Sequence, residues 1–218
     1  MIPTTISSLL IISQVALTQV GSVLPKNQVQ PQVVLGERSM SLDHRQVNKP
    51  LNDIYKDNIL LNMAYMRGVV FKGSPVDWNL VRKPFEYQVD LKPGQTFAFH
   101  DLVRPEYQGK VAFTTNSHFG GEEGYRFDGS MYGMGVCHLA SVINWAAKDA
   151  GLNPVAPTNH DFYAINEIPK QHGVAIYADP NSVGVSQQQN LYITNNKNSA
   201  VTFKFNFDGD NLKVTVLQ

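Results

Sequence analysis

Residues 131–151 read Met-Tyr-Gly-Met-Gly-Val-Cys-His-Leu-Ala-Ser-Val-Ile-Asn-Trp-Ala-Ala-Lys-Asp-Ala-Gly, and they contain the only cysteine of the chain, Cys137. From Val136 to Ala150 the apolar residues recur at intervals of three and four, which predicts a helix with one buried face. Gly151 follows at the position where glycine commonly ends a helix. The stretch therefore predicts a glycine loop that leads into a helix, with Cys137 in its first turn.

The predicted position of Cys137 favours chemistry. The first turn of a helix carries unpaired backbone N–H groups and the positive end of the helix dipole, and both stabilise a thiolate. The thiolate is the nucleophilic form of cysteine. Gly133 and Gly135 would let the backbone approach a substrate and direct N–H groups at an oxyanion. The alternative is that Cys137 is a small buried apolar residue without reactivity.

Length, charge and cysteine content limit the classes of function. The 218 residues are enough for one sizeable core, and the formal net charge is zero with no basic block, which argues against nucleic acid as a partner. A single cysteine permits no internal disulfide and no four-cysteine zinc site. The histidines have no close ligand spacing such as HExxH and stand at positions 44, 100, 118, 138, 160 and 172. We therefore expect no metal and no cofactor.

The first 50 residues differ in composition from the rest of the chain. Residues 1–23 contain an apolar run from Ile6 to Leu17 with the length of a signal-peptide core, although no Lys or Arg precedes it. This segment is predicted to be either a signal peptide or an N-terminal helix, and it offers a possible membrane association. Residues 24–50 are rich in Pro, Gln, Val and Asn and predict a linker or extended arm.

The remaining periodicities predict an α+β fold. Residues 51–67 predict a second helix, which ends at Gly68. Short strands are predicted at residues 69–71, 96–99, 111–113 and 174–177. The C-terminal quarter predicts an antiparallel meander with a hairpin turn at 208–211 and strands at 190–194, 201–207 and 212–216. We expect a mostly antiparallel β-sheet packed with the cysteine-bearing helix and the second helix.

Other candidate residues come from polar segments. His160 lies in an extended, proline-containing stretch about two dozen residues after Cys137, far enough for the chain to return to the start of the helix. His100 and Asp101 are adjacent on a predicted strand, so their side chains should point to opposite faces. The glycine-rich loop 114–130 is long for a connection, which favours a functional role. Its charged residues either bind a polar substrate or form a solvated flap, and they are Glu122, Glu123, Arg126 and Asp128.

Several motifs, taken together and in order, resemble the VanW domain. They are Asn58 through Gly68, Pro93-Gly-Gln-x-Phe-x-Phe99, Gly133-x-Gly-Val-Cys-His138, Ala150-Gly-Leu152, the histidine segment near 160, and Leu191-Tyr-Ile-x-Asn-Asn196. The resemblance covers roughly residues 51 to 217 and predicts a VanW-like domain over 51–218. Each motif is weak alone, but their shared order is specific.

The resemblance implies a bacterial cell-envelope protein, secreted or membrane-anchored, from a family named for its association with glycopeptide resistance clusters. Some members are regarded as L,D-transpeptidases that cross-link peptidoglycan stem peptides through the family cysteine. Carried over by position, that cysteine is Cys137, and the partner histidine is His160.

The chain departs from the family pattern in three places, at Tyr132 and Met134, at His138, and at Thr158 and Asp161. Tyrosine and methionine interrupt the usual glycine run, histidine replaces the usual glutamine, and a usual histidine and serine are absent. These changes leave two candidates for the base, His160 and His138. The His138 ring projects about 100 degrees around the helix from Cys137, which favours His160.

The resemblance, together with the position of Cys137, thus implies acyl transfer on peptidoglycan stem peptides, in which Cys137 attacks an amide carbonyl and His160 acts as the base. Either Asp161 or Asn159 is expected to orient the histidine. The predicted binding residues are Gly133, Gly135, His138, Asn159 and Arg126. Two alternatives remain: a cysteine hydrolase of the same peptides, and a non-catalytic cell-envelope binding module.

Overall fold

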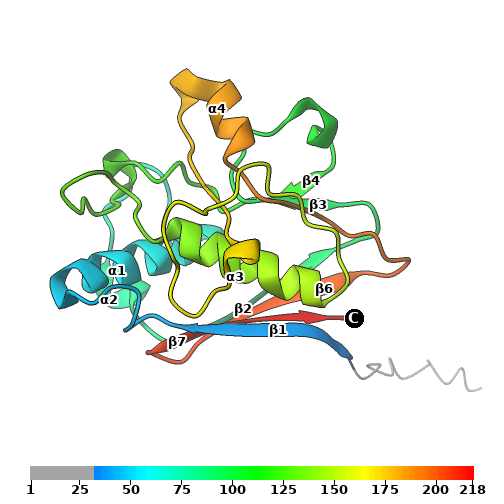
Figure 1. Ribbon diagram of the computed structural model, residues 1–218, viewed down its shortest axis with the longest axis horizontal. Coiled ribbons are helices and arrows are strands. Elements are labelled where there is room, and N and C mark those ends of the chain that lie inside the picture. The colour runs from blue at the N-terminus through cyan, green and yellow to red at the C-terminus, as the bar shows by residue number, and fades with distance from the viewer. Residues whose placement is uncertain (1–31) are drawn as a thin grey trace, which may run out of the picture. The chain divides into compact units, whose positions relative to one another are not determined.

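The fold is α+β, as predicted, with two sheets and four α-helices in the part of the chain that the structure describes (Figure 1). The structure is a computed structural model that describes residues 32–218. The predicted signal peptide or helix over 1–23 lies outside the described residues. None of the helices within 32–218 has the length and apolar character needed to cross a membrane.

The larger sheet is antiparallel, with strand order β1-β7-β6-β2, and the smaller sheet has the order β4-β3-β5. The strands are β1 Val34–Ser41, β2 Phe85–Leu91, β3 Thr96–Ala98, β4 Val111–Phe113, β5 Tyr192–Thr194, β6 Val201–Phe207 and β7 Asn211–Leu217. The helices are α1 Lys49–Met66, α2 Trp78–Val81, α3 Val136–Asp149 and α4 Val183–Gln188. In Figure 1, α3 lies along the larger sheet, and the smaller sheet lies on the other side of α3.

Alternation of apolar and polar residues fixes the face of the larger sheet that packs in the core. Phe203, Phe205 and Phe207 of β6 are buried, because every second residue of a strand points to the same face. The turn after β6 is closed by Asp208, whose Oδ1 accepts hydrogen bonds from the backbone N–H groups of Asp210 and Asn211 at 2.9 and 2.7 Å. The predicted β6–β7 hairpin is therefore confirmed.

The predicted meander is wrong for β5, which pairs with β3 in the smaller sheet and not with β6. Asn195 makes this separation possible at the end of β5. Its backbone N–H donates to the Gln95 carbonyl at 2.9 Å, and its side-chain amide donates to the Leu91 carbonyl at 2.8 Å. The chain is thus tied to the β2–β3 turn before it enters β6, so strands that are adjacent in sequence lie in different sheets.

Residues 34–41, which the composition predicts to be part of a linker, are instead β1, an edge strand paired with β7. Gly36 allows this strand to lie against α3. A Cβ atom at Gly36 would come within 2.6 Å of the Ala146 carbonyl and 2.7 Å of the Ala150 nitrogen, which are both backbone atoms. A strand with glycine and charged residues carries a weak apolar signal, and it is held by its neighbours more than by its own pattern.

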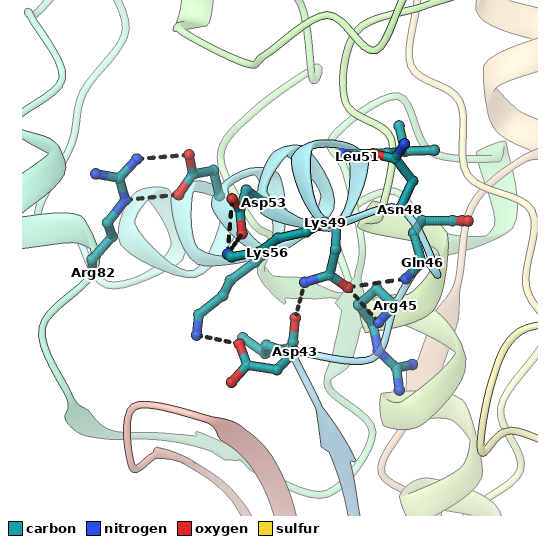
Figure 2. A network of polar contacts seen from close by, with 12 residues as sticks. Asp43, Arg45, Gln46, Asn48, Lys49, Leu51, Asp53, Lys56 and Arg82 are labelled. Atoms are coloured by element: carbon teal, nitrogen blue, oxygen red, sulfur yellow. Dashed lines mark hydrogen bonds and ion pairs between the residues drawn. The ribbon is translucent and has the colours of Figure 1, made fainter.

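The predicted helix over 51–67 is confirmed as α1, and polar residues organise its start (Figure 2). The Asn48 side chain caps the helix by accepting from the Leu51 N–H at 3.2 Å. Lys49 pairs with Asp53 one turn later at 2.9 Å. The predicted strand over 69–71 is wrong, because the N–H groups of residues 69 and 70 donate to the carbonyl of residue 64 and end the helix.

Helix α3 follows the predicted stripe of apolar residues. Leu139, Val142, Ile143 and Ala146 have no exposed surface. The helix ends before Gly151, whose φ of 66° lies in the left-handed region. The apolar face therefore fixes the rotation of α3, and with it the direction in which the first turn presents Cys137.

Candidate functional site

A glycine-containing loop leads into α3 and packs against α1. Gly133 and Gly135 have φ angles of 75° and 104°, and Gly135 is the N-cap residue of α3. A Cβ atom at Gly135 would lie 2.8 Å from the Tyr55 carbonyl oxygen. Both a left-handed backbone and a close approach to α1 thus require glycine at this position.

Replacement of Gly135 by alanine should destabilise the protein by about 2 kcal/mol or more, because strain and steric overlap add. The matched control is Gly129→Ala, since Gly129 has the same φ of 104° but open space around its Cβ position. Thermal unfolding should show a lower midpoint for the Gly135 variant than for the control. Equal midpoints for the two variants would mean that the contact with Tyr55 has no energetic importance.

An extended segment, residues 174–177, lies across the first two turns of α3. The Val174 N–H donates to the Ser141 hydroxyl at 2.9 Å, and the Ile176 N–H donates to Cys137 Sγ at 3.4 Å. Both contacts can form because the distances along the two elements are equal: four residues of helix and two residues of extended chain each advance about 6 Å. The predicted strand at 174–177 is thus an extended segment bound to a helix, and it makes no strand pairing in the described chain.

Cys137 is half-buried as a residue, and its thiol lies against this segment. Burial raises its pKa to about 11, and the backbone of Ile176 and of Cys137 itself lowers the pKa only in part. The sequence predicts the opposite direction, because it places the sulfur in the first turn of a helix. Removal from water disfavours the anion more than the helix dipole stabilises it, so the resting form of Cys137 is the neutral thiol.

Alkylation by iodoacetamide at pH 7 should therefore be slow in the folded protein. With a pKa of about 11 in place of 9.0, the thiolate fraction is about 100-fold smaller than in an unfolded chain. The rate should rise about tenfold per pH unit and level off near pH 11. A comparison of folded and urea-unfolded protein checks this, and faster alkylation of the folded form would contradict it.

Cys137 lines a cavity of about 750 Å³. Histidines and large apolar side chains share it, among them His138, His160, Tyr55, Met131, Tyr132, Phe162 and Tyr163. Phe162 and Tyr163 are 72% and 71% exposed, which is unusual for large apolar residues and places an aromatic rim at the cavity. A cavity of this size with few polar groups is typical of a ligand site.

His160 is held in the cavity by the backbone. Its Nδ1 lies 3.2 Å from the Tyr163 carbonyl oxygen, and its ring lies beside that of Phe162, with 4.2 Å between centroids. Since a carbonyl only accepts, Nδ1 carries the proton, and Nε2 is left with a lone pair. Burial lowers the pKa of His160, although its own backbone, the Tyr163 carbonyl and Asp161 act in the other direction. A neutral imidazole with a free Nε2 is suited to act as a base.

His138 is also buried, and its ring lies close to two others. The centroids of Tyr55 and His160 are 5.3 and 6.4 Å from that of His138. Burial, with smaller effects of Arg45 and His160, lowers the pKa of His138 to about 3, so this imidazole is neutral at physiological pH. Within residues 32–218, Sγ of Cys137 makes no hydrogen bond to either imidazole, and both of its partners belong to Ile176.

Three predicted site residues lie apart from these groups. Arg126 pairs with Asp57 and lines a separate charged cleft that also contains Arg82. Asn159 and Asp161 are exposed and do not line the cavity of Cys137. The hydrogen bond that orients His160 is accepted by a backbone carbonyl, which has no signature in a sequence.

The cavity also contains a histidine that sequence reasoning did not select. His118 Nε2 lies 2.6 Å from Asp101 Oδ1, so Asp101 pairs with His118 and not with its neighbour His100. His100 is fully buried, with Nε2 3.1 Å from the Gln189 carbonyl. His100 and Asp101 lie in a bend just after β3, and only the tertiary fold brings His118 to Asp101. Residues 32–218 contain no group of three or more His, Cys, Asp or Glu arranged to bind a metal ion.

The fold and the cavity define an α+β protein with a half-buried cysteine at the start of a helix, beside a cleft that contains imidazoles and aromatic rings. The family model described as VanW like protein matches residues 87–217, which is more than half of the chain. The chain therefore belongs to the VanW-like family, and the predicted resemblance is confirmed. This family is associated with the cell envelope and with glycopeptide resistance. A search of curated proteins and a search of solved structures returned no match.

Proposed function

We propose that this protein is an acyl transferase of the cell envelope, outside the cytoplasm, whose Cys137 attacks an amide of a peptidoglycan stem peptide. The observation that carries this proposal is that one cavity holds both Cys137 and His160, with the His160 Nδ1 bound to a backbone carbonyl. Membership in the VanW-like family supports the cell-envelope setting. The cavity volume of about 750 Å³ is sufficient for a short peptide.

The proposed reaction has two steps. Nε2 of His160 takes the thiol proton while Sγ attacks the carbonyl carbon; a C–S bond forms, the amide C–N bond breaks, and the departing amine receives the proton. An acceptor amine then attacks the thioester, a new amide forms, and the thiol is restored. Sγ must leave the Ile176 amide and approach His160 when substrate binds, since catalytic hydrogen bonds often tighten only in the complex.

Mass spectrometry of the full chain with a synthetic stem tetrapeptide tests this proposal. We expect a transient adduct on Cys137 that equals the donor acyl group, and an exchange product when a D-amino acid is added as the amine acceptor. Release of a free acid alone, unaffected by the added amine, would identify the hydrolase of the same peptides. Absence of any product and of any adduct would contradict both enzyme functions.

The pH dependence should carry the signature of His160. The working form of a base is neutral, so activity is present above the pKa of His160 and lost as the pH falls through it. Because burial lowers this pKa, the acidic limb of kcat/KM should lie below 6.5. If the acidic limb of kcat/KM had its midpoint at or above pH 6.5, the buried His160 of this cavity could not be the base.

A second function, a non-catalytic module that binds envelope peptides, is favoured by the contacts of the sulfur. Cys137 binds the extended segment as Ser141 does one turn later, and the raised pKa of the thiol suits a packing role. Equal binding of the stem peptide by the native protein and by a Cys137→Ala variant, without turnover by either, would support this function.

A further inference from the structure

His138 has a polar atom that the protein leaves without a partner. Its side chain lines the cavity and the residue is only 6% exposed, yet Nδ1 is buried and makes no hydrogen bond within the described chain. Nε2 also has no partner among residues 32–218, but it is not among the enclosed atoms. Nε2 is therefore the more open nitrogen of a ring that lines the cavity.

The environment of the two nitrogens selects a tautomer. Burial lowers the pKa of His138 to about 3, so the ring carries a single proton at neutral pH. An enclosed N–H without an acceptor is rarer in proteins than an enclosed acceptor without a donor. The proton therefore belongs on Nε2, where a ligand in the cavity can accept it, and the lone pair belongs on the enclosed Nδ1.

The imidazoles of His138 and His160 thus differ in hydrogen-bonding role. His160 has its proton on Nδ1, held by the Tyr163 carbonyl, and offers a lone pair at Nε2. His138 offers an N–H at Nε2. One ring is equipped to accept a proton and the other to donate a hydrogen bond without becoming charged.

The first turn of α3 is short of donors for a developing oxyanion. The Val136 N–H donates to the Gly133 carbonyl at 3.2 Å, and the His138 N–H donates to the Gly135 carbonyl at 2.9 Å. The amide of Cys137 has no backbone acceptor among residues 32–218 and lies beside its own sulfur, so it can turn to a bound carbonyl oxygen. Acyl-transfer sites commonly direct two donors at the oxyanion, so one further donor is required near Cys137.

We infer that His138 supplies this second donor: its neutral Nε2–H binds the carbonyl oxygen of the peptide amide that Cys137 attacks. This role rests on the proposed acyl transfer, and it makes His138 a catalytic residue distinct from the base. The ligand class follows from the chemistry, since a neutral N–H in an aromatic cavity suits the carbonyl of an uncharged amide.

Kinetics of three variants test this role with the stem tetrapeptide as substrate. His138→Leu removes the donor, and kcat/KM should fall about 100- to 1000-fold. Glutamine places an amide N–H near the position of Nε2, so His138→Gln should stay within about tenfold of the native protein. Alkylation of Cys137 involves no carbonyl oxygen, so its rate should change less than about twofold in both variants. Cys137→Ala, the third variant, should have no activity.

The results distinguish failure of the donor role of His138 from failure of the proposed acyl transfer. Native activity in His138→Leu, a folded but inactive His138→Gln, or a displaced acidic limb in either variant would overturn the donor role. Activity in Cys137→Ala would instead overturn the proposed function. If the leucine variant fails to fold, nitrogen NMR of histidine-labelled native protein decides: we expect the proton of His138 on Nε2, and a proton on Nδ1 would overturn the inference.

Discussion

Cys137→Ala should reduce turnover of a stem peptide by at least about 10⁴-fold, because the attacking atom is lost and neither imidazole can replace it. Folding should survive. The Ile176 N–H loses its contact with Sγ at 3.4 Å, which costs about 1 kcal/mol, or a fall of about 3 °C in the unfolding midpoint. Turnover and thermal unfolding, measured on the same preparation, check both parts.

Ser141→Ala is the matched control for this experiment. Ser141 binds the same extended segment one turn along α3, accepting from the Val174 N–H at 2.9 Å. Its removal should cost a comparable amount of stability and change turnover by less than about tenfold, because the hydroxyl does not line the cavity. If both variants lost activity equally, the attachment of the segment, and not the thiol, would explain the loss.

Asn58→Leu should be the most destabilising polar replacement near the site. Asn58 has no exposed surface, and its side chain makes three hydrogen bonds to the loop before α3. Its amide nitrogen donates to the carbonyls of Arg126 and Met134 at 3.1 and 3.0 Å, and its oxygen accepts from the Arg126 N–H at 2.7 Å. Loss of three hydrogen bonds to partly buried backbone groups should cost about 3 kcal/mol and lower the unfolding midpoint by about 10 °C.

Asn79→Leu provides the comparison for Asn58. Asn79 lies in α2 and is exposed, so the same substitution there should change stability by less than about 0.5 kcal/mol. The Asn58 variant should also lose activity, because the loop that positions Gly135 and Cys137 is released from α1. A midpoint within about 2 °C of the native protein would contradict the role of Asn58 in holding this loop.

The parts of the fold that were predicted correctly are those fixed by local periodicity. The stripe from Val136 to Ala150 specifies α3, and the turn at Asp208 specifies the β6–β7 hairpin. The errors are non-local. β5 has the pattern of a strand, but the hydrogen bonds of Asn195 to Leu91 and Gln95 decide which sheet it joins. Pairing between distant strands has no signal in a local pattern.

In the candidate site too, the residue types could be predicted from the sequence, whereas contacts between distant segments could not. The sequence indicates Cys137, His138 and His160, and all three line one cavity. It does not indicate the carbonyl of Tyr163, since every residue has a carbonyl. The direction of the thiol pKa was predicted wrongly because burial depends on the packing of Ile176, whereas the position of a cysteine in a helix can be deduced from sequence alone.

The pairing of β1 with β7 also constrains how the protein is made. The first strand of the described chain acquires its partner only when the last strand has left the ribosome, since β7 lies between β1 and β6. Contacts of such large sequence separation slow folding and leave β1 without a partner during synthesis. A nascent chain halted before β7 should therefore remain sensitive to protease along Val34–Ser41, while helices with local hydrogen bonds form earlier.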